Sequence, residues 1–526
     1  MKPEKKQKLA GSIHYDSKTL RWLTLTVFFT ILFLNLLLLT KNYYWDGVFF
    51  AQLIEDTPQL NSSLIHPNHL LYLPFEYLIY RAVRWAGFAG RALTILQITS
   101  CFFSAATAIV FFRINLKLFK SLYTSLTLTA LFAFSAMWWK FSTDANAYVL
   151  AVLLLLVCFC LVLPERQPRP FALALVHALA MFAHQLSVFF FAVAIAGLVF
   201  QSRTKVLKHV VKYAATVILL TAGVYFFSFY LVTGTFAPGR FVSWTTYFSP
   251  EHGFTLNAWS NLVYTLRSQG RVFFGGRLSF IRDLGGSLIL GLAGVAALAV
   301  LTLLFALFRH PRELKSAIAA ALPGPRQFRA LTILCAVWIA IYIVFLFFFI
   351  PQNTFYRLFY LAPIVLLGGT LLNAAGKAPG HVRRYRAALF VVAMFCANLA
   401  FSQYPYTQVR ANPPLELALK LNQVWRPGTT VYFALPNSDE SLIRYFNPAT
   451  VWVQANPESF RQDISQLPPR GGNAWLETTL IDAFQQTPEG KSWLEAHASR
   501  RADCELVNSK YRIEFWQLNP ESFANR

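Results

Sequence analysis

The sequence predicts an α-helical polytopic membrane protein with about eleven transmembrane helices, amphipathic helices on its outer face and a small C-terminal α/β domain. Of its 526 residues, 56% are hydrophobic and only 13% are charged, a balance that a water-soluble chain of this size would hardly tolerate. Apolar runs recur up to residue 403, and the composition becomes mixed beyond it. We therefore expect a transmembrane module over residues 1–403 and an extracytoplasmic α/β domain over residues 404–526.

Eleven apolar runs predict the membrane spans, because each approaches the length needed to cross a bilayer. The first run follows the basic start Lys2–Lys8. It is longer than a signal-peptide core and has no small-residue cleavage site behind it, which indicates a retained span. The fifth and sixth runs are short enough to be tilted, re-entrant or one broken pair. The expected spans are 20–40, 92–112, 122–139, 146–163, 170–183, 186–200, 209–232, 285–308, 328–350, 357–375 and 387–403.

The distribution of positive charge predicts the orientation. The formal net charge is +23, but Lys and Arg fall in short clusters between apolar runs, as in residues 309–329 and 377–386. By the positive-inside rule these loops and the N-terminus are cytoplasmic. The same distribution argues against nucleic-acid binding. The opposite face then holds the loops 41–91 and 233–284 and the tail.

The two long outer loops carry patterns of their own. Residues 47–55 and 70–84 have apolar residues at helical spacing beside polar ones, which predicts helices lying along the membrane surface. In the loop 233–284, arginines such as Arg271 alternate with aromatic residues, and glycines cluster at 270, 275 and 276. This pattern fits a mobile loop over a site for an anion, and it fits equally a solvated loop at an aromatic belt.

The tail has the pattern of a small α/β domain. Residues 430–435 and 451–454 read as strands, and 439–446, 475–486 and 491–499 as helices. Residues 504–507 and 511–518 read as a hairpin around Asn508-Ser509-Lys510. The tail contains no glycine-rich phosphate loop and no His/Cys set with metal-ligand spacing. It therefore indicates a supporting or acceptor-binding role.

Asp46 directly follows the first predicted span, at a membrane edge. A carboxylate there is costly unless it has a task or a partner. It can act as the general base that removes a proton from an incoming hydroxyl or amine. It can also simply cap the helix predicted over residues 47–55, and a residue can do both.

Other polar residues of the outer face are candidates for substrate binding. Arg357 opens an apolar span at the expected level of a lipid phosphate, which its planar guanidinium suits, although an arginine there can also extend to the headgroups. Asp144 precedes the fourth span and can cap that helix. The remaining candidates are His66, His69, Asn146, His184 and Arg271.

The three histidines leave two interpretations open. Imidazole is a common zinc ligand, but His66-x-x-His69 after a proline turn is weak evidence for a metal. His184, alone on an apolar hairpin, is equally a buried, hydrogen-bonded histidine. A carboxylate with cations beside a membrane fits transfer of a group from a lipid phosphate, for which no cofactor is required and a divalent metal is optional.

Four stretches carry a resemblance to a known family. They are Asp46-Gly47 followed by residues 66–72, residues 134–150, residues 183–186, and residues 427–445. They resemble motifs of the GT-C superfamily of glycosyltransferases, which use polyprenyl-phosphate sugars. The chain is most similar to the bacterial branch related to protein O-mannosyltransferases.

The resemblance implies that Asp46 is the catalytic base, that His184 is a site residue and that the protein lies in a bacterial inner membrane. Two positions depart from the family pattern. Asn68-His69 stands where Pro-Gly is usual, and Asn146 stands where the family tends to have an acid. The first departure alters the shape of the loop, and the second removes a charge from the site.

The sequence therefore predicts a membrane glycosyltransferase that moves a sugar from a polyprenyl-phosphate carrier to a protein hydroxyl, lipid or glycan acceptor at the outer face. Its partners would be this donor, the acceptor and the surrounding membrane lipids. Two alternatives stay open. One is a carrier or flippase for a lipid-linked or anionic substrate, although the centres of the spans are almost free of ionisable residues. The other is a non-catalytic membrane scaffold.

Overall fold

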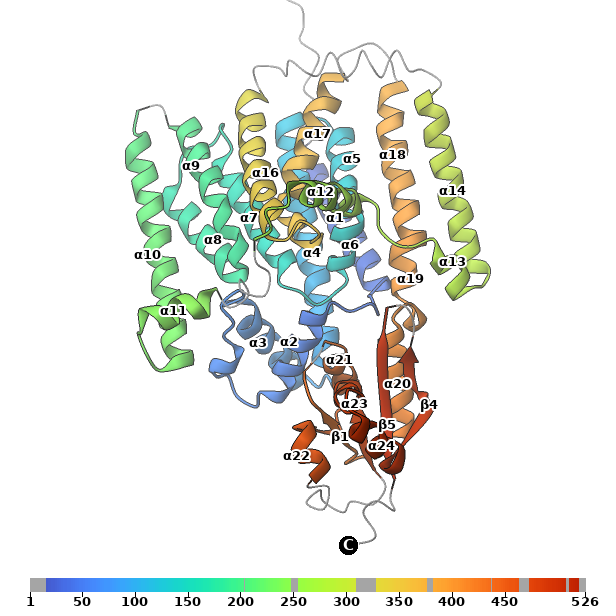
Figure 1. Cartoon of the computed structure of the whole chain (residues 1–526). Coiled ribbons are helices and arrows are strands. Elements are labelled where there is room, and N and C mark those ends of the chain that lie inside the picture. The colour runs from blue at the N-terminus through green and yellow to red at the C-terminus, as the bar shows by residue number, and fades with distance from the viewer. Residues whose placement is uncertain are drawn as a thin grey trace, which may run out of the picture. The chain divides into compact units, whose positions relative to one another are not determined.

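The computed structural model describes residues 16–202, 204–246, 254–308, 328–375, 382–436, 438–462, 473–507 and 510–519 (Figure 1). The basic start Lys2–Lys8, the loop 309–327 and the predicted turn Asn508-Ser509 lie outside these ranges. The chain divides into two compact units. The first contains the chain up to Thr40 together with Leu53–Pro405. The second contains Lys41–Gln52 and the chain from Tyr406 onward.

Among the described residues, six helices are long and apolar enough to cross a membrane. They are α1 (Ser17–Leu37), α4 (Ala92–Phe119), α10 (Val206–Thr233), α14 (Ser287–Phe308), α16 (Arg329–Phe349) and α18 (Val382–Asn398), the last continued by the π-helical turn η5 (Leu399–Gln403). The chain is an integral membrane protein.

Five apolar segments are shorter. They are α5 (Leu122–Ala133), α7 (Tyr148–Val162), α8 (Pro170–Ala183), η2 with α9 (Gln185–Phe189, Phe190–Gln201), and η4 with α17 (Phe355–Tyr360, Leu361–Ala375). Every predicted span overlaps a long or a short apolar helix. The positions of the helices are thus confirmed, whereas the number that crosses the membrane stays a prediction.

Helix α4 lies at the centre of the first unit, packed against α1, α5 and α7. Small residues such as Ser100, Ala105 and Ala108 are fully buried along it, which lets neighbouring helices approach closely. The Ser104 hydroxyl donates to Ser142 Oγ at 2.7 Å and accepts from Trp138 Nε1 at 3.2 Å. These bonds fix the short helix α6 (Ala136–Ser142) against α4.

The loop 41–91 contains the two expected helices. The helices predicted over 47–55 and 70–84 are confirmed by α2 (Trp45–Asp56) and α3 (Tyr72–Trp85), whereas their position along the membrane surface stays a prediction. In the loop 233–284 the chain forms α11 (Pro238–Thr245), α12 (Ala258–Phe273) and α13 (Ser279–Leu284). The aromatic and basic pattern of that loop thus belongs largely to short helices.

The glycines of this loop allow close packing. Gly275 N donates to Asn398 Oδ1 at 3.2 Å. Gly276 has a positive φ of 88°, and a Cβ at this position would clash with the Phe401 carbonyl oxygen. Arg277 N donates to that same carbonyl at 3.0 Å. The segment 275–277 therefore lies against η5, and close contact explains Gly275 and Gly276 but not Gly270.

The second unit contains a five-stranded sheet in the order β2-β1-β3-β5-β4. Strands β1 (Thr430–Phe433), β2 (Val451–Gln454) and β3 (Ala474–Glu477) are parallel, and β4 (Ala498–Val507) and β5 (Arg512–Leu518) are antiparallel. The helices are α20 (Pro413–Val424), α21 (Ser438–Phe446), α22 (Pro457–Gln462), α23 (Thr478–Gln485) and α24 (Pro488–His497).

The predicted helix over 475–486 is wrong at its start, because Trp475–Glu477 belong to strand β3. Trp475 packs with Leu421 and Ile443 in one core, whereas its neighbour Leu476 packs with Phe484 in another. Both faces of the strand are covered. Such a strand lacks alternation between polar and apolar residues, and a short apolar run of this kind is not told from a helix by periodicity.

Candidate functional site

Asp46 lies in the first turn of α2, in the second unit. Its segment is held to the rest of that unit by a hydrogen bond from Asn412 Nδ2 to the Lys41 carbonyl (2.9 Å) and by stacking of Tyr43 on Phe446. The Tyr44 carbonyl accepts from Val48 N at 3.3 Å and thus opens the helix. The interpretation of Asp46 as the residue that caps α2 is therefore wrong.

The carboxyl group of Asp46 is suited to accept a proton near neutral pH. Asp46 is half-buried. Burial raises the pKa of Asp46 to about 7, and a hydrogen bond from the Tyr44 side chain lowers it in part. A carboxylate with this pKa gains proton affinity and is still largely ionised just above pH 7, which favours general base catalysis.

The first unit brings the three predicted histidines together. The ring centroids of His66 and His69 are 5.5 Å apart, and those of His69 and His184 are 4.7 Å apart. Backbone hydrogen bonds join the two segments, from Leu71 N to the Phe182 carbonyl (2.8 Å) and from Gln185 N to the Asn68 carbonyl (3.0 Å). We call His66, His69 and His184 the histidine cluster.

Hydrogen bonds assign the tautomers of these rings. His66 Nδ1 accepts from Asn68 N at 3.2 Å, and His184 Nδ1 accepts from Leu186 N at 3.1 Å. The proton of each neutral ring must then sit on Nε2. Burial lowers the pKa of His66 to about 4 and that of His184 to about 3. At neutral pH both rings are therefore uncharged Nε2–H donors.

The same assignment tests the zinc interpretation. A zinc ligand needs a lone pair, and in His66 and His184 the lone pair of the neutral ring is already occupied at Nδ1. Within the described part of the chain, no group of three His, Cys, Asp or Glu side chains is arranged to hold a metal ion. In these tautomers His66 and His184 cannot serve as zinc ligands, so the histidine cluster does not fit a zinc ion.

Aromatic residues link the histidine cluster to the turn that carries Arg357. The His184 ring lies 5.0 Å from Tyr148, 5.8 Å from Tyr356 and 4.9 Å from Phe359. Tyr356 and Phe359 flank Arg357 in η4. The cluster, the start of α7 and η4 thus form one region of the first unit.

The Arg357 side chain is fully buried. It donates from Nη1 to Tyr360 Oη at 2.6 Å and from Nη2 to the Pro351 carbonyl at 2.7 Å. Its Nε has no hydrogen-bond partner, and no carboxylate of the described residues forms an ion pair with it. Tyr360 donates in turn to Gln269 Oε1 on α12 at 2.9 Å. The guanidinium is thus a buried positive charge held by neutral groups.

Arg271 does not join this region. It lies near the end of α12 and is exposed to solvent. Residues two positions apart on a helix point in different directions, so Gln269 and Arg271 do not share a face. Its predicted role in binding substrate remains a prediction.

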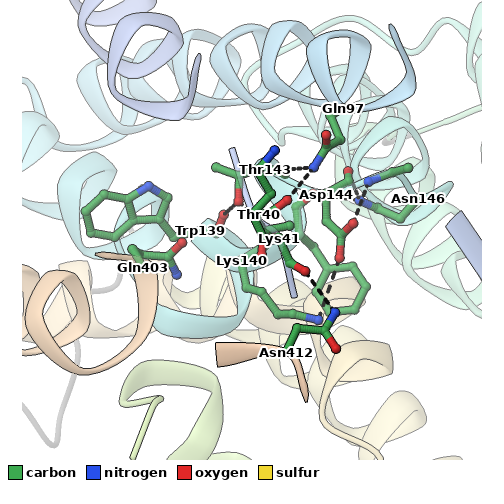
Figure 2. A network of polar contacts seen from close by, with 12 residues as sticks. Thr40, Lys41, Gln97, Trp139, Lys140, Thr143, Asp144, Asn146, Gln403 and Asn412 are labelled. Atoms are coloured by element: carbon green, nitrogen blue, oxygen red, sulfur yellow. Dashed lines mark hydrogen bonds and ion pairs between the residues drawn. The ribbon is translucent and has the colours of Figure 1, made fainter. Parts of the chain in front are cut away.

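Figure 2 shows the network around Asp144 and Asn146. Asp144 is fully buried and pairs with Lys140, with Oδ2 and Nζ 3.7 Å apart. Burial lowers the pKa of Lys140, and the Asp144 charge opposes this shift. Asp144 Oδ1 accepts from Ala145 N at 2.9 Å. The predicted cap of the following helix is not this residue.

Asn146 caps that helix instead. Its Oδ1 accepts from Tyr148 N (3.0 Å) and Val149 N (3.2 Å). Its Nδ2 donates to the carbonyls of Phe141 (2.6 Å) and Asp144 (2.9 Å). An amide has two donor and two acceptor positions, and the backbone occupies all four. This explains an amide where the related family tends to have an acid, since a carboxylate could not donate.

Gln97 fixes the same region from α4. Its Nε2 donates to the carbonyls of Thr40 (2.9 Å) and Thr143 (3.0 Å), and Thr40 N donates to the Thr143 carbonyl at 3.3 Å (Figure 2). One buried side chain thus joins the end of the first span to the segment that carries Asp144.

The sequence interpretation missed Glu76 on α3. Its side chain is fully buried, and burial raises its pKa well above the usual range, with the Thr99 hydroxyl opposing in part. The carboxyl groups of Glu76 and Asp144 lie close enough to the Tyr72 hydroxyl to raise its pKa, in addition to the effect of burial. A signal was present, because Glu76 shares the buried face of α3 with Tyr72, Leu73 and Tyr80, and an acid on an apolar face is unusual.

Comparison of the sequence with protein-family models and with curated proteins finds no match. Among solved structures, the Archaeoglobus fulgidus oligosaccharyltransferase in complex with zinc and sulfate is similar, with a TM-score of 0.50 and 10% identity over 94% of this chain and 72% of that one. The chain therefore shares the fold of this oligosaccharyltransferase.

Two structures of ArnT from Cupriavidus metallidurans are also similar. The one bound to undecaprenyl phosphate has a TM-score of 0.46 and 11% identity over 95% of this chain and 98% of that one. The apo state has the same TM-score and identity over 97% and 100%. The predicted resemblance to GT-C enzymes is confirmed at the level of the fold by the oligosaccharyltransferase, and the narrower branch related to protein O-mannosyltransferases stays a prediction.

Proposed function

We propose that this GT-C protein is a membrane glycosyltransferase. It transfers a sugar from a polyprenyl-phosphate carrier to a protein hydroxyl, lipid or glycan acceptor at the outer face of the membrane. The observation that carries the proposal is Asp46, a half-buried carboxyl group in the first turn of α2 whose pKa is raised to about 7 by burial. The GT-C fold, shared with an oligosaccharyltransferase, supports the reaction class.

In the proposed reaction Asp46 acts as the general base. Its carboxylate accepts the proton of the acceptor hydroxyl, and the acceptor oxygen attacks the anomeric carbon of the sugar. The bond between that carbon and the phosphate oxygen breaks, and polyprenyl phosphate leaves with the bonding electron pair. The proton ends on Asp46 and is released to solvent afterwards. A base with a pKa near the working pH is efficient in this step.

The leaving phosphate requires hydrogen-bond donors and positive charge. We assign these to the Nε2–H groups of His66 and His184 and to Arg357. Neutral N–H groups donate hydrogen bonds to the phosphate oxygens without adding a permanent charge. Among the described residues no carboxylate neutralises the Arg357 charge, so the guanidinium can attract a phosphate. Asp144 and Asn146, saturated by protein groups, support the shape of this region.

The proposal is tested by transfer from a radiolabelled polyprenyl-phosphate sugar, with purified protein in lipid nanodiscs. Asp46→Asn keeps the shape of the side chain and removes the base, so turnover should fall at least a hundredfold. Asp56→Asn is the matched control, because Asp56 ends the same helix and is exposed. Full activity of Asp46→Asn would overturn the assignment. Movement of the intact lipid-linked sugar between leaflets without transfer would favour a carrier.

A further inference from the structure

The C-terminal unit has an open cavity at the carboxyl ends of its three parallel strands. Strand β1 lies between β2 and β3. After β1 the chain continues to β2, on one side of β1. After β3 it continues to β4 and β5, which lie on the opposite side of the sheet from β2. Adjacent connections that diverge in this way open a crevice, and this is the place where open α/β sheets bind ligands.

The cavity has a volume of about 760 Å³, within the usual range for small-molecule sites. Its walls come from the ends of the three strands and from the helices that follow them. The lining residues are Ala434, Leu435, Gln454, Ala455, Asn456, Pro457, Thr479, Asp482, Ala483 and Gln486.

Hydrogen bonds fix the floor of this cavity. Thr479 Oγ1 accepts from the backbone N–H groups of Ala434 (3.0 Å) and Leu435 (3.2 Å). The same hydroxyl donates to Glu477 Oε2 at 2.6 Å. The ends of β1 and β3 are thus joined by one side chain, so the cavity is formed before a ligand enters.

The polar side chains of the wall keep both donors and acceptors for a ligand. Asn456 uses Oδ1 to accept from Glu458 N (2.9 Å), which leaves its amide N–H groups. Gln454 uses Nε2 to donate to the Ala434 carbonyl (3.1 Å), which leaves its Oε1. Asp482 contributes a carboxylate that pairs with Arg512 at 3.2 Å through one oxygen.

This chemistry selects among ligand classes. None of the described lining residues carries a positive charge, and Asp482 would repel a phosphate or a carboxylate. Arg512, the cation next to the cavity, is already paired with Asp482 and Glu514. The rest of the lining is apolar, from Ala434, Leu435, Ala455, Pro457 and Ala483, and suits the C–H face of a ligand. A ligand with several hydroxyl groups both donates and accepts, and it satisfies this wall.

We propose that this cavity is a binding site for a neutral saccharide. The inference does not depend on the transfer activity, because it concerns a preformed cavity in the second unit and rests on that unit's own residues. If the proposed function holds as well, the saccharide is part of a glycan acceptor. The cavity would then bind a part of the acceptor that does not contain the reacting hydroxyl.

The test measures binding to the full-length protein in nanodiscs by saturation-transfer NMR and calorimetry. The probes are a panel of neutral oligosaccharides and matched sulfated oligosaccharides. We expect neutral probes to bind and sulfated ones to bind more weakly. Gln486→Ala and Asp482→Asn should each weaken binding about five- to tenfold, the loss of one hydrogen bond.

Matched controls separate this site from the rest of the domain. Gln423→Ala on α20 and Glu495→Gln on α24 change exposed residues away from the cavity and should leave binding unchanged. The melting temperatures of all four variants should match that of the wild-type protein. The proposal is overturned if no neutral probe binds, if sulfated probes bind more tightly, or if binding survives both cavity variants. Because Asp46→Asn leaves this cavity intact, it should bind the same probes even where transfer is lost.

Discussion

Asn146→Asp should destabilise the protein strongly, although it exchanges one atom and restores the acid that the related family tends to have. The substitution removes the two N–H donors that bond to the Phe141 and Asp144 carbonyls at 2.6 and 2.9 Å. Each of these two hydrogen bonds contributes about 1 kcal/mol, although the Phe141 carbonyl still accepts from Asp144 N at 3.4 Å. The new charge would also be buried beside the buried carboxylate of Asp144. We expect a loss of about 3 kcal/mol or more.

Thermal unfolding in nanodiscs, followed by tryptophan fluorescence, measures this effect. Asn257→Asp is the matched control, because Asn257 caps α12 through Oδ1 alone and is exposed. A carboxylate keeps that acceptor, so the control should melt within about a degree of the wild-type protein. If Asn146→Asp melts like the control, Asn146 is not the saturated structural amide described here. A gain in transfer rate would instead mark the position as part of the reacting site.

Two further substitutions test the buried groups. Glu76→Gln should raise the melting temperature, and this increase should grow as the pH rises above about 4.5. Folding raises the pKa of the Glu76 carboxyl group, so deprotonation of the wild-type residue above that pH destabilises the folded protein. An equal increase in melting temperature at pH 5 and at pH 9 would refute this. Gly276→Ala should destabilise by several kcal/mol, because the new Cβ meets the Phe401 carbonyl and the residue has a positive φ. Gly223→Ala in α10, where a Cβ meets no neighbour, should melt at or slightly above the wild-type temperature.

The sequence predicted the helical fold well because its signal is long and local. A run of some twenty apolar residues has few other structures available to it in a membrane, so even the short spans of residues 170–183 and 186–200 coincide with helices. Strand β3 was missed because it is four residues long and buried on both faces. The information that makes it a strand lies in its pairing with β1 and β5, which are distant in sequence.

In the candidate site, too, the sequence predicted the residue types but not the contacts between distant segments. His66 and His69 were identified together with His184 as chemical candidates, and their meeting in space depends on backbone bonds between segments more than a hundred residues apart. Asn146 was interpreted as a lost charge, whereas its four hydrogen bonds make it a structural amide. The residue type shows how many hydrogen bonds a side chain can donate and accept. Only the structure shows which of these bonds are already made.

The pH dependence of transfer tests the role of Asp46 most directly. Since the base must be ionised to accept a proton, kcat/KM should rise about tenfold per pH unit below pH 7 and level off above it, with an apparent pKa near the value of about 7 set by burial. The histidine cluster, neutral over this range, should add no second step between pH 5.5 and 8.5. A flat profile, or one with its only inflection near pH 4, would contradict the account.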